Sequence, residues 1–158
     1  MGILHRLIAA AALCLWAGTA AAECRPDRVD IRGEFGTVRF RVELALTPED
    51  QSRGLMFREE MARMSGMLFV YPQTREVGFW MRNTLIPLDM IFVDEAGRVV
   101  KVHADAVPLD ETVIRSGAPT RGVLELNAGM AATLGIDVGD ELRSPVMPQD
   151  GAAWPCAE

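Results

Sequence analysis

The sequence has few of the residues that most often carry catalysis or bind metals. It contains only two histidines and three cysteines in 158 residues. His103 is the one histidine beyond the first 22 residues, which excludes a histidine-rich zinc site. There is no GxSxG nucleophile motif, no phosphate-binding P-loop, no HExxH motif and no glycine-rich dinucleotide fingerprint. The sequence therefore predicts neither a metal nor a cofactor, and it identifies no catalytic residue.

Positive charge is also in the minority. The sequence has 16 basic and 22 acidic residues, which gives a net charge of −6 and a pI near 5.0. This balance argues against nucleic acid and anionic membrane surfaces as main partners. The hydrophobic share of 49% and the charged share of 24% are typical of one soluble globular domain.

The one long apolar stretch lies at the N-terminus. An uncharged segment from Leu7 to Ala22 follows Arg6, and it ends in the small-residue pattern Ala20-x-Ala22. This arrangement predicts a signal peptide over residues 1–22, cleaved after Ala22. A membrane span is less favoured, because the stretch has about 16 residues where a span needs roughly 20. We expect a periplasmic or secreted protein with no stable membrane span after cleavage.

Export changes how the cysteines are interpreted. Cys14 leaves with the signal peptide, and the remaining pair, Cys24 and Cys156, stands at the two ends of the chain. Disulfides persist outside the cytoplasm, and the ends of a domain often lie close together. The sequence predicts a Cys24–Cys156 disulfide. A redox or metal-binding thiol pair is less favoured, because the sequence has no CxxC spacing and no neighbouring histidines.

The remaining pattern predicts short strands with one or two short helices. Residues 37–46 alternate apolar and polar side chains, as in a half-buried strand. Thr47 and Pro48 predict the start of a short helix that ends near Gly54. A second helical turn is expected at residues 130–134. Further strands are expected at residues 66–71, 77–81, 88–93, 98–103, 121–126 and 141–143.

The fold class is therefore mainly β, or β-rich α+β: a small antiparallel barrel-like or sandwich domain. We expect a signal peptide at 1–22, an N-terminal arm at 23–34, the β-rich domain at 35–143 and an irregular tail at 144–158.

The segment from Gly78 to Asp89 holds the densest group of candidate binding residues. Aromatic faces stand there beside guanidinium, amide and carboxylate groups, as in a pocket for a small polar molecule. Outside the segment, Arg53 and Glu125 are candidates to contribute a charged group to the same binding site. A structural role is also open, because the polar side chains can bond loop backbone and Trp80 can be core. The candidate ligand-binding residues are Arg53, Trp80, Arg82, Asn83, Thr84, Asp89 and Glu125.

Two other functions are alternatives. One is a hydrolase-like enzyme that uses Asp89 with an arginine, although a lone carboxylate is thin support for catalysis. The other is Cu(I) binding through Met61, Met64 and Met67, since soft thioethers select Cu(I). Methionine is also an ordinary gap-filler in protein cores.

The sequence resembles the domain-of-unknown-function 192 family. The resemblance rests on the runs SRGLMFREEM (52–61), SGMLFVY (65–71), GFWMRNTLIPLDMIFVDEAGRV (78–99) and RGVLELNAG (121–129), in that order. It implies a small, mostly β domain, often exported, with no settled activity. Met61 and Met64 do not belong to the family pattern.

Together these observations favour an exported, non-enzymatic binding or accessory module. Its expected partner is a small polar or anionic ligand, a glycan or peptide segment, or another component of the cell envelope.

Overall fold

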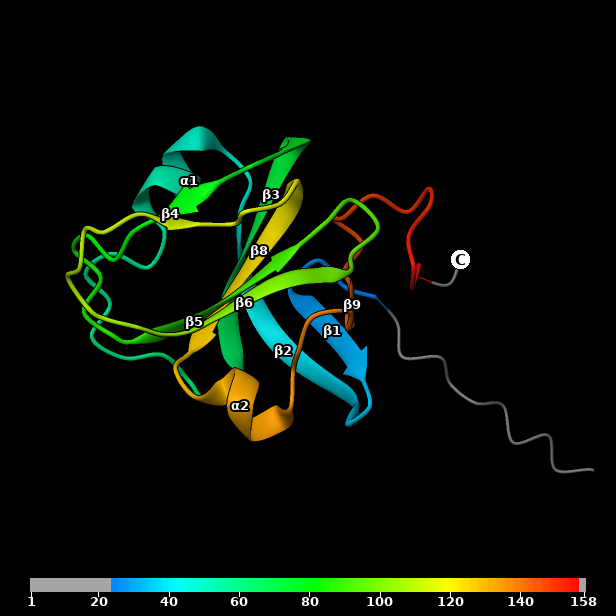
Figure 1. Cartoon of the computed structure of the whole chain (residues 1–158), viewed down its shortest axis with the longest axis horizontal. Helices are drawn as coiled ribbons and strands as arrows, with labels where there is room; N and C mark the ends of the chain where they lie inside the picture. Colours follow the sequence, from blue (N-terminus) through cyan, green and yellow to red (C-terminus); the bar gives the residue numbers. More distant parts are fainter. Residues whose placement is uncertain (1–23, 157–158) are drawn as a thin grey trace, which may run out of the picture.

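The computed structural model describes residues 24–156, so the predicted signal peptide at 1–22 lies outside the described residues. The helices and strands follow in chain order: β1 (Arg28–Gly33), β2 (Gly36–Ala45), α1 (Pro48–Arg53), β3 (Ser65–Arg75), β4 (Gly78–Phe79), β5 (Leu88–Val93), β6 (Val99–Ala106), β7 (Ile114–Arg115), β8 (Thr120–Asn127), α2 (Met130–Leu134) and β9 (Glu141–Arg143). Figure 1 shows how these elements are arranged.

Seven strands form one sheet in the order β6-β5-β8-β3-β2-β1-β9. Every neighbouring pair is antiparallel except β2 and β3, which run parallel. The sheet curls into a half-barrel, and β4 and β7 form a separate two-stranded sheet. This confirms the expected mainly β fold class with barrel character and two short helices.

The two edges of the curled sheet meet at the start of β6. An isolated bridge pairs Arg98 with Glu141 of β9, and the Leu142 amide donates to the Gly97 carbonyl. A Cβ on Gly97 would lie 2.4 Å from the Leu142 carbonyl oxygen, so only glycine allows this approach. The contact largely closes the barrel and protects its edges.

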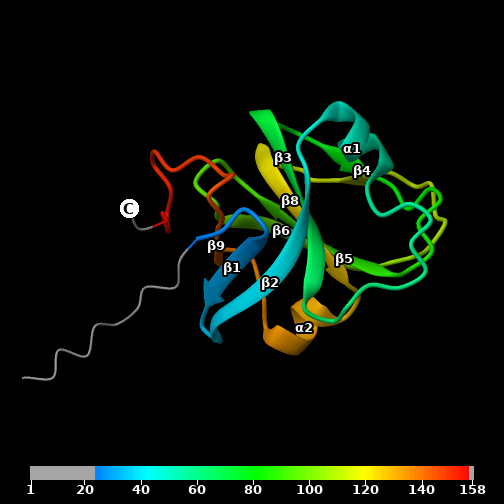
Figure 2. The same ribbon diagram turned by 180° about the vertical axis from the view of Figure 1, so that it is seen from behind.

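The sheet has a hydrophobic core on each face, because successive side chains of a strand point to opposite sides. The first core is enclosed by the curl of the sheet and includes Leu68, Ile91 and Leu124. The second includes Phe69, Phe92 and Val123. Both views of the ribbon place α1 and β4 side by side at one end of the molecule (Figures 1 and 2).

Helix α1 forms where the sequence predicts it. The Thr47 side chain accepts a hydrogen bond from the Asp50 amide at 3.1 Å, and Pro48 occupies the first helical position. The helix ends at Gly54, which has a φ of 48°. These caps fix the direction in which the chain crosses toward β3.

Asp89 holds three backbone segments together. Its carboxylate accepts hydrogen bonds from the amides of Asp105 (3.0 Å), Gly129 (3.2 Å) and Ala131 (2.8 Å). The side chain is fully buried in β5, and two of its donors belong to the first turn of α2. Asp89 thus satisfies two of the orphan amides at the start of α2, where the N-cap residue makes no side-chain cap, and fixes the end of β6.

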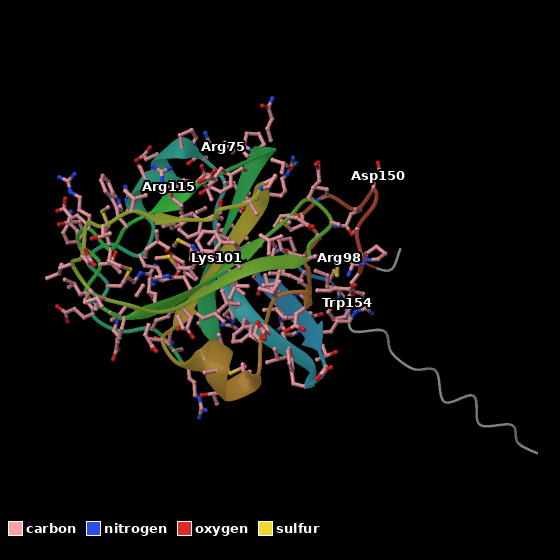
Figure 3. The ribbon with its side chains drawn as sticks, viewed as in Figure 1. Arg75, Arg98, Lys101, Arg115, Asp150 and Trp154 are labelled. Carbon is pink, nitrogen blue, oxygen red and sulfur yellow. A yellow bond between two sulfur atoms is a disulfide. The ribbon has the colours of Figure 1, made fainter. Side chains whose placement is uncertain are left out.

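The two ends of the described chain pack against the barrel. The segment 23–34, expected to be an arm, contributes β1, which pairs with both β2 and β9. From residue 144 onward the described chain forms neither helix nor strand, yet Met147 is buried in the first core. Trp154 lies between two guanidinium groups, 4.6 Å from Arg32 and 4.1 Å from Arg143. It lies on the side of β1 and β9, away from Arg75 and Arg115 (Figure 3).

Cys24 and Cys156 form a disulfide, with their Cα atoms 5.8 Å apart and a sequence separation of 132. The pairing is the one that the sequence predicts. Within residues 24–156, neither helix has the length and hydrophobicity that crossing a bilayer requires.

We predict that Asp89→Ala lowers the free energy of unfolding by about 3 kcal/mol, because one buried and two partly buried amides lose their acceptor. Urea denaturation followed by circular dichroism measures the change. Asp94→Ala is a matched control, since Asp94 accepts only the exposed Arg98 amide in the β5–β6 turn. Equal losses in the two variants would contradict the role given to Asp89.

We also predict that the double variant Cys24→Ser, Cys156→Ser unfolds at a lower urea concentration. The chain-entropy model gives a loss of up to about 5 kcal/mol for a loop of this length. Oxidised and reduced wild-type protein should differ in the same direction, whereas the variant should not respond to a reductant. An unchanged unfolding midpoint would show that the packing around Trp154 alone fixes the chain ends.

Candidate functional site

A pocket of about 250 Å³ opens between α1, β4 and the second face of the sheet. Its lining combines aromatic side chains with a few polar groups. The lining residues are Gln51, Ser52, Arg53, Gly54, Leu55, Met56, Phe69, Tyr71, Gly78, Phe79, Trp80, Thr84 and Glu125.

The walls follow from strand alternation and aromatic packing. Phe69 and Tyr71 are two residues apart on β3, so both side chains face the second core and the pocket. Phe79 of β4 packs edge-to-face on Phe69, with ring centroids 5.0 Å apart. Phe79 also packs on Phe92 of β5 at 5.9 Å. This stacking holds β4 over the sheet and keeps the pocket walls rigid.

The rim of the pocket is polar on the α1 side. Gln51 Nε2 donates to the carbonyl oxygens of Ala45 and Val70, which ties α1 to the end of β2 and the middle of β3. Arg53 forms an exposed pair with Glu49 at 3.4 Å, a weak contact in solvent. The guanidinium of Arg53 therefore stays accessible at the pocket mouth.

Trp80 forms the opposite side of the rim. It is 45% exposed, which is high for a tryptophan and shows that it is not a core residue. The Arg82 guanidinium lies over its ring at 5.5 Å. An exposed, partly supported indole offers a flat face to a bound molecule.

Glu125 is the one acidic residue of the pocket lining. Its neighbours across the sheet are Met67 of β3 and Met90 of β5, both buried. Glu125 is 4% exposed, and its Oε2 atom has no hydrogen-bond partner. Burial raises the pKa of the Glu125 carboxyl to about 8. The group is therefore mostly protonated and uncharged at neutral pH.

Tyr71, a buried residue, also lines the pocket. Burial raises the pKa of Tyr71 to about 12, although the nearby Arg75 charge acts to lower it. The Arg75 guanidinium lies 5.1 Å from the Tyr71 ring centroid. Tyr71 accordingly remains a neutral hydroxyl that can donate or accept a hydrogen bond.

Asp89 and Glu125 lie on opposite faces of the sheet. Asp89 pairs with Leu126 of β8, whereas Glu125 pairs with Met90, the next residue along β5. Because neighbouring residues point to opposite faces, the two carboxyl groups cannot share a cleft. Asp89 accepts hydrogen bonds from three backbone amides and does not line the pocket. The hydrolase-like alternative needs Asp89 as its catalytic carboxyl group, and this position does not support that role.

The structure brings together four of the seven candidate residues. Arg53, Trp80, Thr84 and Glu125 line the pocket, whereas Arg82, Asn83 and Asp89 do not. Arg82 supports Trp80, and the amide of Asn83 donates to the Met56 sulfur at 3.8 Å. The Thr84 hydroxyl donates to the Arg82 carbonyl at 3.3 Å.

The sequence did not identify four further lining residues, Phe69 and Tyr71 of the walls and Gln51 and Ser52 of the rim. Phe69 and Tyr71 come from a run, residues 66–71, that is apolar at five of its six positions and reads as a buried strand. Gln51 and Ser52 lie on a short polar helix with no distinctive spacing. For the pocket residues on α1, the sequence offers one indication, which is the resemblance of residues 52–61 to the family pattern.

The methionines of the copper alternative occupy different environments. Met67 is buried in the second core, Met61 packs against that core and Met64 is 39% exposed. Within residues 24–156, histidine, cysteine, aspartate and glutamate side chains form no group of three that could hold a metal.

Left-handed backbone conformations occur next to the pocket lining, where Phe57 follows Met56 and Asn83 precedes Thr84. Phe57, Asn83 and Leu109 have φ values of 63°, 54° and 65°, in a region that bulky side chains rarely adopt. Backbone hydrogen bonds hold them: the Phe57 amide donates to Asn83, and the Leu109 amide donates to Met81 and Thr84. Strain of this kind is typical of functional sites.

Comparison with known proteins supports the architecture and leaves the activity open. The family model DUF192, described as "Uncharacterized ACR, COG1430", matches residues 29–144. A protein of unknown function from Novosphingobium aromaticivorans DSM 12444 is 47% identical, with a TM-score of 0.72, and the match covers 73% of this chain and 83% of that chain. A Sinorhizobium meliloti 1021 protein, for which a role as transcription regulator has been suggested, is 43% identical, with a TM-score of 0.73 and coverage of 77% and 95%. No curated protein matches the chain.

We predict that Glu125→Gln stabilises the protein increasingly as pH rises. Glu125 stays protonated in the folded wild type up to about pH 8, whereas the unfolded chain ionises near 4.5. Wild-type stability is therefore lost between these values, and the variant avoids that loss. The difference in unfolding free energy should grow by more than about 1 kcal/mol between pH 5 and pH 8.

Urea denaturation at several pH values measures this difference. Glu60→Gln, at an exposed position, is the matched control and should change stability little at any of them. A constant difference between the Glu125 variant and wild type would show that the carboxyl is not desolvated.

Proposed function

The chain belongs to the DUF192 family, and for this member we propose a non-enzymatic role as a binding module for a small polar ligand. The ligand occupies the pocket between α1 and β4. The observation that carries the proposal is the Glu125 carboxyl, which lines the pocket with a buried oxygen that no protein group satisfies.

The unsatisfied oxygen gives a physical reason for a ligand. A buried polar atom without a partner costs about 1–3 kcal/mol, and folded proteins rarely keep one without a use. A ligand that donates a hydrogen bond to Oε2 would recover this free energy on binding. The binding energy is then concentrated at the base of the pocket.

The rim supports a ligand with a flat or extended body. Trp80 offers an exposed aromatic face, while Ser52 and Arg53 stand on the other side of the mouth. A sugar ring, a peptide segment or a short chain with an anionic end fits between such walls. The aromatic interior suits the rest of the molecule.

Catalysis is less favoured than binding. Asp89 is fully engaged with backbone amides, so Glu125 is left without a second acidic group in the pocket lining. General acid–base hydrolysis of the glycosidase type needs two carboxyl groups that flank one bond.

We place the module in the periplasm or outside the cell. The apolar segment Leu7–Ala22 with its small-residue cleavage pattern supports export. The Cys24–Cys156 disulfide suits an oxidising compartment. The transcription role suggested for the S. meliloti relative is not adopted for this chain, because a net charge of −6 disfavours nucleic acid.

The proposal predicts that small polar compounds bind at Trp80. A panel of monosaccharides, amino acids, alkylamines, alcohols and short carboxylates is screened by amide and indole NMR shifts. Hits should shift the Trp80 indole resonance, and Trp80→Ala should weaken them about tenfold through loss of the aromatic face. Val138→Ala is the control, since Val138 is exposed in the α2–β9 loop.

The proposal fails if no compound of the panel binds at millimolar concentration. It fails equally if hits bind Trp80→Ala as tightly as wild type.

A further inference from the structure

We infer that the ligand of this pocket carries a primary ammonium group, and that this group pairs with Glu125. The inference rests on the proposed function and specifies the chemistry of its ligand. It narrows the ligand to amines, such as a free amine or the amino end of a larger molecule.

The pocket supplies an acceptor that no described protein group satisfies. Oε2 of Glu125 has no partner, and the Thr84 hydroxyl already donates to the Arg82 carbonyl. The buried wall residues Phe69 and Leu55 are apolar. An ammonium group brings three donors, one of which satisfies Oε2.

The aromatic walls favour a cation over a neutral donor. Phe69, Phe79, Tyr71 and Trp80 all line the same pocket, and the faces of aromatic rings attract positive charge. The one basic residue of the lining, Arg53, extends from α1 into solvent with 67% of its side chain exposed. No other lining residue is basic, and Arg75, whose guanidinium lies 5.1 Å from the Tyr71 ring centroid, is exposed.

Binding of an ammonium group would release a proton. At neutral pH the Glu125 carboxyl is mostly protonated, since burial raises its pKa to about 8. The protonated acid and the ammonium ion give a carboxylate–ammonium pair and one proton, which passes to the solvent. A neutral alcohol would bind the protonated acid and release none, and an anion would meet no positive charge at this depth.

Few other titratable or charged groups lie near Glu125 and could be the source of the released proton. Tyr71 approaches from β3, and the α1 side contributes Arg53. The side chains of β5 on this face are apolar, and beyond them β6 carries Lys101 and His103 opposite Phe92 and Met90. Lys101 is held over the Phe92 ring and donates to the Arg115 carbonyl.

The test compares three probes of equal length: n-butylamine, 1-butanol and butyrate. Each is titrated into the whole disulfide-bonded protein and followed by the Trp80 indole NMR shift. Butylammonium should bind at least tenfold more tightly than 1-butanol, and butyrate should not bind in the pocket. The butylammonium affinity should rise about tenfold per pH unit from pH 6 to 7 and level off above pH 8.

Calorimetry in two buffers with different ionisation enthalpies counts the protons. Butylammonium binding at pH 7 should release close to one proton, and 1-butanol binding should release none. Glu125→Gln should remove both the preference for the amine and the proton release. Glu60→Gln is the matched control and should behave as wild type.

The outcomes separate the two proposals. If 1-butanol shifts Trp80 and binds as tightly as butylamine, the ammonium inference is wrong and the binding function stands. If neither the three probes nor the wider panel binds, both are wrong. Should Glu125→Gln not fold, the pH profile and the proton count of the wild type still decide: a flat profile with no release overturns the inference.

Discussion

The structure depends on one strand that is buried on both faces. β8 lies between β3 and β5 in the sheet, and its side chains alternate between two hydrophobic cores. Leu124 and Leu126 fill the core inside the curl, whereas Val123 and Glu125 face the side covered by α1 and β4. A single change of register would exchange the two sets and place a carboxyl inside the barrel. The position of the pocket is thus fixed by the same alternation that builds the barrel.

The two buried carboxyl groups show two ways of placing an acid in a core. Asp89 has three amide donors, and it connects β5 to α2 and the end of β6. Glu125, on the other face, has a buried oxygen with no donor and two methionines as cross-strand neighbours. The first arrangement stabilises the fold, and the second lowers its stability above the pH at which an unfolded glutamate ionises. A pocket next to the unsatisfied group explains why a fold would keep it.

Local patterns predicted much of the fold, because each element carries its own signal. The Thr47–Pro48 cap and the alternation of β2 both stand in the sequence where the structure has them. The parallel pairing of β2 with β3 and the strand β1 were not predicted, since both depend on partners distant in the chain. For the site, the residue types in the sequence identified Trp80 and Glu125 as candidate binding residues. They could not show that Asp89, a candidate on the same grounds, lies outside the pocket. That distinction depends on which face of the sheet each residue occupies, and on amides contributed by residues 105, 129 and 131.

The left-handed residues next to the pocket lining bear on the entropy of binding. Phe57 and Leu109 are held in an unfavourable conformation by hydrogen bonds to the segment 81–84, so the loops that carry them are ordered before any molecule binds. Ordering a flexible loop costs about 1–2 kcal/mol per residue, and here folding has already met that cost. A small molecule with only a few polar contacts can then bind measurably, because little of its interaction energy is spent on arranging the protein around it.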